Sequence, residues 1–313
     1  RNAPRIKDIA KVLWVMYLAL TALEAGLLLL AGMTPFEAVC HAFTTMSTGG
    51  FSTSTASLAG WPSAAVQWIV IAFMFLAGGN FSIYEQLAVG PRRTALRNTE
   101  FQVYVVLFAV MTALVFGVLL RSGAVQGGTE PVLRAATFQV LTVSTTTGYA
   151  THDFDQWPQI LRLVLVLMMF VGGCTGSTGG GMQVARLVIY FKAAVVELRK
   201  NINPRAVLVV RMGDRPLERE VVANIMGYLA MYAGLMVLAT VLLTLMGLDI
   251  TSASTASVAS LSNIGPGLGM VGPAANYAAV PAAGKWLLAL CQLMGRLELY
   301  SVLVLMLRRT WVR

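Results

Sequence analysis

A short polar loop centred on glycine interrupts the apolar sequence at three places. The loops are Ser47-Thr48-Gly49-Gly50-Phe51, Thr145-Thr146-Thr147-Gly148-Tyr149 and Ser262-Asn263-Ile264-Gly265-Pro266. Inside a membrane, such a loop is tolerated only where protein or a water-filled cavity surrounds it, and its carbonyl oxygens can then replace the hydration shell of an ion. The repetition therefore predicts an ion conductor, and we expect the ion to be potassium.

Composition places the chain in a membrane, since 57% of its residues are hydrophobic and only 12% are charged, against about 25% charged in soluble proteins. A bilayer needs about 20 helical residues, and the apolar stretches of that length predict six spans: residues 9–32, 64–89, 101–120, 160–198, 221–246 and 283–307. The three cysteines, Cys40, Cys174 and Cys291, are an odd number in apolar surroundings, so we expect packing residues rather than disulfides. The predicted fold class is an all-α polytopic membrane protein.

Charge placement predicts the topology. Four clusters hold 17 of the 23 basic residues: Arg1, Arg5, Lys7 and Lys11; Arg92, Arg93 and Arg97; Lys192, Arg199, Lys200, Arg205, Arg211, Arg215 and Arg219; and Arg308, Arg309 and Arg313. The positive-inside rule makes all four cytoplasmic, which requires an even number of crossings between them. Segments such as residues 34–46 are too short to cross and are expected to dip in and return as re-entrant hairpins. The net charge of +9 is thus explained by orientation and not by nucleic-acid binding.

Each repeat is then expected to contain an outgoing helix, a short pore helix, the polar loop and a returning helix, as in the pore domains of potassium channels. The repeats would be residues 1–98, 99–200 and 201–313. Capping residues begin the pore helices at Thr34, Thr129 and Asp249. The negative ends of the helix dipoles then point at the loops and favour a cation there. Acidic residues either form a negative outer mouth or are simply solvated: Glu37, Glu130, Asp153, Asp155 and Asp249.

Several ordered motifs together resemble the TrkH/KtrB/HKT superfamily of potassium transporters, most closely its TrkH branch, over essentially the whole chain. The motifs are His41-Ala42-Phe43 with Gly49-Gly50-Phe51-Ser52-Thr53, Thr145 to Tyr149 with Asp153-Phe154-Asp155-Gln156-Trp157-Pro158, the run 172–181, Asn263-Ile264-Gly265-Pro266-Gly267-Leu268-Gly269 and Gly295-Arg296-Leu297-Glu298. The resemblance implies one pore built from four repeats. Only three are present, so we expect the first repeat to be missing, and the chain begins at Arg1 instead of an initiator methionine.

Carried over by position, the resemblance assigns the potassium filter to three residues in each loop. They are Thr48, Gly49 and Gly50; Thr146, Thr147 and Gly148; and Asn263, Ile264 and Gly265. Glycine adopts positive φ without steric cost, which lets the chain turn its carbonyls toward the axis. The alternative of three surface turns leaves the matched pore helices unexplained.

The glycine-rich run 172–181 interrupts the fourth predicted span. Each interior glycine costs a helix about 1 kcal/mol relative to alanine, so we expect the span to break, as helices do where backbone lines a permeation path. The resemblance makes this run an intramembrane gate, with the gate residues Gly173, Thr175, Gly176, Ser177, Thr178, Gly179, Gly180 and Arg296. A phosphate-binding loop would need a lysine after its glycines, which is absent. A helix-packing seam of small residues remains the structural alternative.

Arg296 falls in the middle of the last predicted span, where a charge is costly and usually functional. Glu298, two residues on, points elsewhere, and the resemblance suggests carbonyls of the run 172–181, or an acidic group below the pore, as partners of Arg296. Asn80 and Glu85 either line the same vestibule or make interhelical hydrogen bonds.

The remaining polar residues in apolar surroundings are assigned structural positions. Glu24 is expected to face the interior of the bundle. His41 and His152 are expected to be structural, since their spacing matches no metal site.

The predicted function is potassium uptake across the bacterial inner membrane, without enzymatic activity or an organic cofactor. The alternatives are a non-conducting membrane scaffold and an intramembrane serine protease, with Ser177 as nucleophile and His41 or His152 as base. The resemblance implies a homodimer in contact with membrane lipid and with a cytosolic nucleotide-binding regulatory ring like TrkA, which would meet the basic linker 192–219. The sequence leaves open whether transport is channel-like or coupled to another ion.

Overall fold

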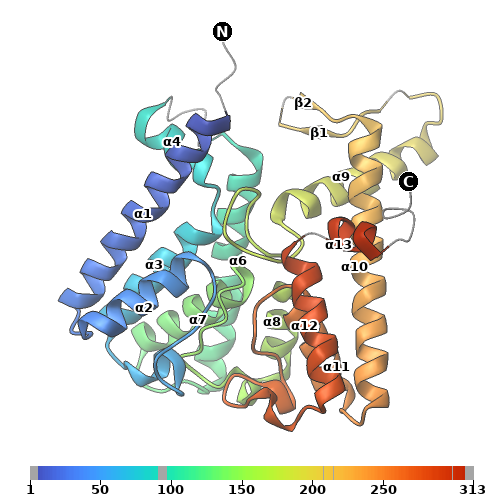
Figure 1. Cartoon of the computed structure of the whole chain (residues 1–313). Helices are drawn as coiled ribbons and strands as arrows, with labels where there is room; N and C mark the ends of the chain where they lie inside the picture. The colour runs from blue at the N-terminus through green and yellow to red at the C-terminus, as the bar shows by residue number, and fades with distance from the viewer. Residues whose placement is uncertain (1–5, 91–96, 207, 214, 298, 307–313) are drawn as a thin grey trace.

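Three long helices form the frame of the molecule (Figure 1). The computed structural model describes residues 6–90, 97–206, 208–213, 215–297 and 299–306. The long helices are α1 (Ile6–Leu30), α6 (Thr99–Ser122) and α10 (Arg219–Leu245). Within the described residues these are the helices long and apolar enough to cross a membrane unbroken. They confirm the first, third and fifth predicted spans.

A short helix packs against each long helix, in the positions predicted for the pore helices. These helices are α2 (Pro35–Met46), α7 (Thr129–Ser144) and α11 (Ile250–Leu261). Thr34 and Glu37 form a capping box at α2, with Glu37 accepting the Thr34 N–H at 3.0 Å, and Asp249 accepts the Ser252 N–H at 3.0 Å. The cap expected at Thr129 is wrong, because the N-cap is Gly128 and no side chain caps this helix.

The returning helices are broken in all three repeats. Their halves are α3 (Ala64–Gly78) and α4 (Phe81–Val89), α8 (Gln159–Met169) and α9 (Val184–Ile202), and α12 (Ala282–Arg296) and α13 (Leu299–Met306). The break between α8 and α9 was predicted. The spans predicted at 64–89 and 283–307 correspond to two of these pairs, and the bends of 100° between α3 and α4 and of 116° between α12 and α13 were not predicted. The described residues therefore contain five candidate spans if each bent pair counts as one, whereas the sequence predicted six.

Short elements complete the chain. The 3-10 turns are η1 (Ser57–Gly60), η2 (Phe154–Gln156), η3 (Gly269–Val271) and η4 (Tyr277–Ala279). In the basic linker, β1 (Arg211–Met212) pairs antiparallel with β2 (Arg215–Pro216), a hairpin that the all-α prediction did not include. Residues named in the predictions that lie outside the described part of the chain are Arg1, Arg5, Arg92, Arg93, Glu298, Arg308, Arg309 and Arg313.

Large apolar side chains are exposed on the long helices, and polar side chains are buried on two of the short ones. On the long helices Trp14, Leu30 and Leu245 are 66%, 86% and 79% exposed, whereas Gln139 of α7 and Ser257 of α11 are fully buried. Such helices are stable where lipid covers the apolar side chains and where the helices themselves satisfy their backbone polar groups. The arrangement agrees with a helical membrane protein in which most of α7 and α11 is buried, whereas α2 buries one face and exposes Phe36, Val39 and Phe43.

Candidate functional site

The three polar loops leave the C-terminal ends of α2, α7 and α11 along one shared backbone path. In each loop a non-glycine residue and the glycine two positions later both have positive φ: Thr48 at 52° and Gly50 at 64°, Thr146 at 60° and Gly148 at 86°, and Asn263 at 59° and Gly265 at 107°. Non-glycine residues seldom adopt positive φ. Its occurrence at three equivalent positions indicates that the surrounding structure imposes this path.

Hydrogen bonding within the loops also repeats. The residue before each glycine donates its N–H to the carbonyl five residues earlier: Gly49 to Thr44 at 2.8 Å, Thr147 to Thr142 at 2.9 Å, and Ile264 to Ala259 at 2.8 Å. Within the described part of the chain, no hydrogen bond is made to the carbonyls of Thr48, Gly49, Thr146, Thr147, Asn263 or Ile264. Buried carbonyls are nearly always paired, and most of these residues are buried. Each loop thus offers the carbonyls of two consecutive residues, six in all, to a ligand.

Neighbouring loops pack closely against one another. A Cβ added to Gly50 would overlap the carbonyl oxygen of Thr147, and a Cβ added to Gly148 would overlap that of Ile264. The first loop thus contacts the second as the second contacts the third. A Cβ added to Gly265 would meet no described atom within 4 Å. The three loops form an arc that stays open between the third loop and the first.

An open cavity of about 320 Å³ lies on one side of the arc, where Gly50, Gly148 and Pro266 form part of its wall. None of the described residues lining it is charged. The wall consists of backbone, hydroxyl, amide and apolar groups, so the expected negative mouth does not line this cavity.

The five acidic residues of that expected mouth make local contacts. Glu37 and Asp249 cap α2 and α11, Asp153 caps η2, Glu130 pairs with Arg134 at 3.0 Å, and Asp155 pairs with Arg162 at 3.1 Å. Hydrogen bonds from the Ser252 side chain and backbone lower the pKa of Asp249, and the Thr34 backbone N–H does the same for the pKa of Glu37. These carboxylates fix helix ends and loops.

The glycine-rich loop, residues 170–183 between α8 and α9, lies against the opposite side of the arc. Its Thr178 carbonyl accepts the Thr48 hydroxyl at 2.8 Å, and its Gly180 N–H donates to the Thr146 hydroxyl at 2.7 Å. A Cβ added to Gly180 would overlap the carbonyl oxygen of Ser262. The loop therefore touches all three polar loops, and because it is not helical it is no seam between packed helices.

Arg296 contacts the same loop from α12. Its Nη1 donates to the Thr178 carbonyl at 2.8 Å, so one carbonyl receives hydrogen bonds from both Thr48 and Arg296. Arg296 is the last residue of α12 and lies at the bend between α12 and α13, so it ends a helix instead of lying within a continuous one as expected.

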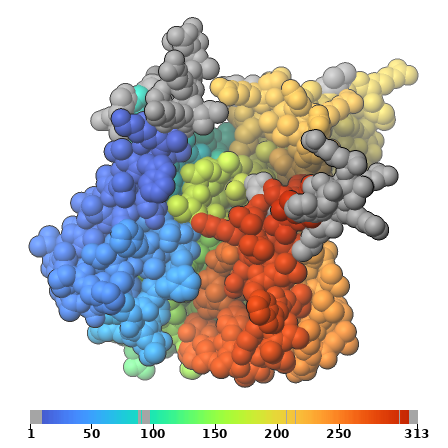
Figure 2. Space-filling view, in the orientation of Figure 1, coloured from blue at the N-terminus to red at the C-terminus, as the bar shows by residue number. Residues whose placement is uncertain are grey.

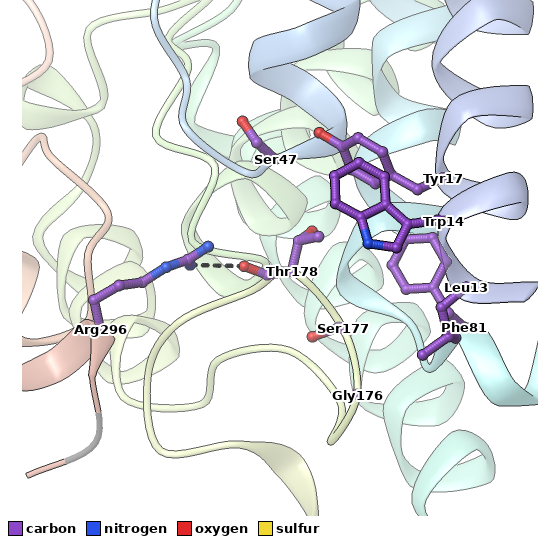
Figure 3. A pocket seen from close by; sticks show the side chains of 9 residues that line it. All are labelled: Leu13, Trp14, Tyr17, Ser47, Phe81, Gly176, Ser177, Thr178 and Arg296. Atoms are coloured by element: carbon purple, nitrogen blue, oxygen red, sulfur yellow. Dashed lines mark hydrogen bonds between the residues drawn. The ribbon is translucent and has the colours of Figure 1, made fainter. Parts of the chain in front are cut away.

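Figure 3 shows how Arg296 reaches toward Thr178 while Trp14, Tyr17 and Phe81 face the loop from the other side. A cavity of about 370 Å³ lies between these groups, on one side of the glycine-rich loop. In the space-filling view the loop is visible in yellow-green between the blue N-terminal and the red C-terminal segments (Figure 2). The loop is thus reached from this open face.

Comparison with known proteins decides the family. The family model TrkH, described as a cation transport protein, matches residues 1–310. The chain belongs to the TrkH family. The crystal structure of the potassium transporter TrkH from Vibrio parahaemolyticus matches with a TM-score of 0.91 at 35% identity, covering 99% of this chain and 66% of that one.

Two TrkH relatives show how much of the family this chain spans. The Trk system potassium uptake protein TrkH of Vibrio parahaemolyticus is 36% identical over 99% of this chain and 64% of its own length. The protein of the same name from Escherichia coli K12 is 34% identical over 98% of this chain and 63% of its own length. The chain therefore spans less than two thirds of these relatives.

The structure of this TrkH-family chain does not bring together the serine and histidine of the serine protease considered from the sequence. Ser177 Oγ donates to the Cys174 carbonyl at 2.7 Å. His41 instead bonds Ser52 Oγ at 3.0 Å, and His152 bonds Thr151 Oγ1 at 3.1 Å. In the described structure Ser177 has no histidine base within hydrogen-bond reach, and both histidines have local structural partners.

The three other polar residues singled out in the sequence, on α1 and around α4, each have a different environment. Asn80 caps α4 by accepting the Ser82 N–H at 2.9 Å and lies beside Gly176 of the glycine-rich loop. Glu85 is partly exposed on α4. Glu24 is fully buried, as expected, close to Thr45; neither carboxylate oxygen makes a hydrogen bond to the described residues.

Sequence reasoning missed the tyrosines behind the TrkH-family loops. Tyr149 Oη lies 2.6 Å from Thr44 Oγ1, Tyr232 Oη lies 2.6 Å from Ser262 Oγ, and Tyr277 donates to the Gly265 carbonyl at 2.5 Å. Each joins a polar loop or the end of its pore helix to another element. Only Tyr149 lies inside a loop motif, so the sequence carries no local signal for the other two.

Proposed function

We propose that this chain contributes to potassium uptake across the membrane through a selectivity filter of backbone carbonyls. The ligands are the carbonyl oxygens of Thr48, Gly49, Thr146, Thr147, Asn263 and Ile264, next to Gly50, Gly148 and Gly265. The observation that carries the proposal is that these carbonyls recur on one backbone path and make no hydrogen bond within the described chain. A dehydrated cation supplies the missing partner.

The pore helices support a cation at this position. The helices α2, α7 and α11 end at Met46, Ser144 and Leu261, one residue before their loops. The C-terminal end of a helix carries partial negative charge, which stabilises a nearby cation. Three such ends converge on the loops, so the field favours a cation even though the adjoining cavity wall carries no charge.

The glycine-rich loop is proposed to be the gate. It lies on the side of the three polar loops opposite the 320 Å³ cavity, and Arg296 donates to its Thr178 carbonyl. The gate residues in this loop are Gly173, Thr175, Gly176, Ser177, Thr178, Gly179 and Gly180. An ion that leaves the filter on this side meets the loop and the guanidinium together. The Arg296 charge repels a cation, and its hydrogen bond holds the loop in place, so both effects oppose conduction.

The open side of the arc supports a pore completed by a further repeat. The chain spans 64% of a TrkH relative, and the space beside Gly265 lies where a fourth loop would pack. We assign the repeats to residues 1–98, 99–200 and 201–313, with the basic linkers on the cytoplasmic side of a bacterial inner membrane. The proposed partners are a second copy, membrane lipid and a nucleotide-binding ring of the TrkA type at the linker 192–219.

Ion flux through the complete transporter in proteoliposomes tests this function. We expect potassium flux well above sodium flux under matched gradients. A scaffold would carry neither ion, and a protease would instead cleave membrane peptides in a way that depends on Ser177. Equal potassium and sodium flux would contradict the carbonyl filter, and the absence of flux would contradict transport.

A further inference from the structure

A buried carboxylate holds the glycine-rich loop on the side away from Arg296. Glu100 is the second residue of α6 and only 6% exposed. Its Oε1 accepts the backbone N–H of Thr175 at 2.6 Å. This contact at Thr175 adds to the other hydrogen bonds of the loop, among them that of Cys174 N–H to the Gly78 carbonyl at 2.8 Å and those of the Thr178 carbonyl.

The same carboxyl group also reaches the start of α9. This helix begins at Val184, and its N-cap residue Gln183 provides no side-chain hydrogen bond. The first N–H groups of a helix need acceptors, and a carboxylate at this end is favoured by the helix dipole. Val184 donates to the Gly173 carbonyl at 3.0 Å, and the Ala185 N–H interacts with the Glu100 carboxyl group. The Glu100 carboxyl group therefore lies close to the first turn of α9.

These contacts join the two ends of the loop. Thr175 lies near its beginning and Ala185 just beyond its end, so one side chain on α6 closes the loop at its base. Arg296 holds the loop near its tip, at the Thr178 carbonyl. Glu100 on α6 accepts a backbone N–H of the loop, and Arg296 on α12 donates to a backbone carbonyl of the loop.

We propose that Glu100 is a positioning residue that fixes the glycine-rich loop and the start of α9 in the position seen here. The consequence for transport rests on the proposed function, because loosening the loop raises flux only if the loop is the gate. The glycine-rich loop separates Glu100 from the filter carbonyls, and Glu100 makes no described contact with them. We therefore expect the selectivity for potassium over sodium to stay unchanged.

The test compares Glu100→Gln and Glu100→Ala with Glu220→Gln in the complete transporter. Glu220 is a matched control, since it is also the second residue of a long helix, α10, but is exposed. Hydrogen exchange of peptides covering residues 172–186 reports the loop directly. We expect exchange about tenfold faster in Glu100→Ala, a smaller increase in Glu100→Gln, which keeps one acceptor, and no change in Glu220→Gln.

Flux measured on the same samples separates the two proposals. Faster exchange with severalfold higher potassium flux and an unchanged potassium-to-sodium ratio supports both. Faster exchange with unchanged flux supports the role of Glu100 and overturns the gate. Unchanged exchange in the Glu100 variants overturns the role of Glu100, and Glu100→Gln decides the matter if Glu100→Ala does not fold.

Discussion

The contact between Gly50 and the Thr147 carbonyl gives the sharpest prediction. Alanine at Gly50 places its Cβ on the carbonyl oxygen of Thr147, and alanine at Gly148 does the same to Ile264. Gly123, the C-cap of α6, is a matched control. Its φ of 65° equals that of Gly50 within a degree, yet a Cβ there meets no atom of the described residues within 4 Å.

The magnitudes follow from this difference. Positive φ costs an L-residue about 1–2 kcal/mol, and this strain is the whole expected cost of Gly123→Ala. Gly50→Ala and Gly148→Ala add the overlap, about 1–3 kcal/mol by analogy with overpacked cores. The overlapped carbonyl must also retreat by roughly 1.5 Å to restore van der Waals separation. If that withdrawal removes about 1.4 kcal/mol of preference for potassium over sodium, the selectivity ratio falls about tenfold.

Potassium and sodium flux in proteoliposomes, together with thermal unfolding, distinguishes these terms. We expect all three variants to unfold at lower temperature than the wild type, and only Gly50→Ala and Gly148→Ala to lose selectivity. Unchanged selectivity in both, at matched reconstitution, would refute the filter assignment. A loss as large in Gly123→Ala would show that the effect is global strain.

Three further predictions concern the gate, the interior and the tyrosines. Arg296→Ala and a deletion within residues 175–180 should each raise potassium flux at unchanged selectivity and combine less than additively, because contacting groups couple; equal or lower flux in both at matched membrane abundance contradicts the gate. Glu24→Gln should keep or raise the unfolding temperature, since a buried carboxylate without hydrogen bonds is costly by about 1–3 kcal/mol; a fall of several degrees would reveal a stabilising partner. Tyr149→Phe should cost about 1–3 kcal/mol by leaving buried hydroxyl and carbonyl groups unpaired and should reduce selectivity; an unchanged unfolding temperature would contradict its supporting role.

Local patterns predicted the short helices, the polar loops and the break before α9. Capping residues, glycine and apolar length act within a few residues of one another, so the sequence shows them directly. The left-handed φ of Thr48, Thr146 and Asn263 was not predicted. Threonine does not favour it, although asparagine adopts it more often than most residues, and the close packing of neighbouring loops accompanies it.

Long-range contacts explain what the sequence did not show. The bend after Gly78 was missed. The Gly78 carbonyl is satisfied by Cys174 N–H at 2.8 Å, and that of Ala77 by Thr178 N–H at 3.3 Å. Gly78, Gly79 and the N-cap residue Asn80 are local signals for a break that the sequence analysis overlooked, and hydrogen bonds from the glycine-rich loop stabilise the helix end there. Arg296 was misplaced for a related reason, since α12 ends at this residue within an apolar run that suggested continuous helix.

The most direct test of the central claim is the position of the permeant ion. A structure of the complete transporter in thallium or rubidium, both of which substitute for potassium, should show anomalous density among the carbonyls of Thr48, Thr146 and Asn263 and of the residues that follow each. We expect excess potassium to displace this density and excess sodium to leave it in place. Density elsewhere, or density displaced equally by both ions, would contradict a potassium filter at these loops.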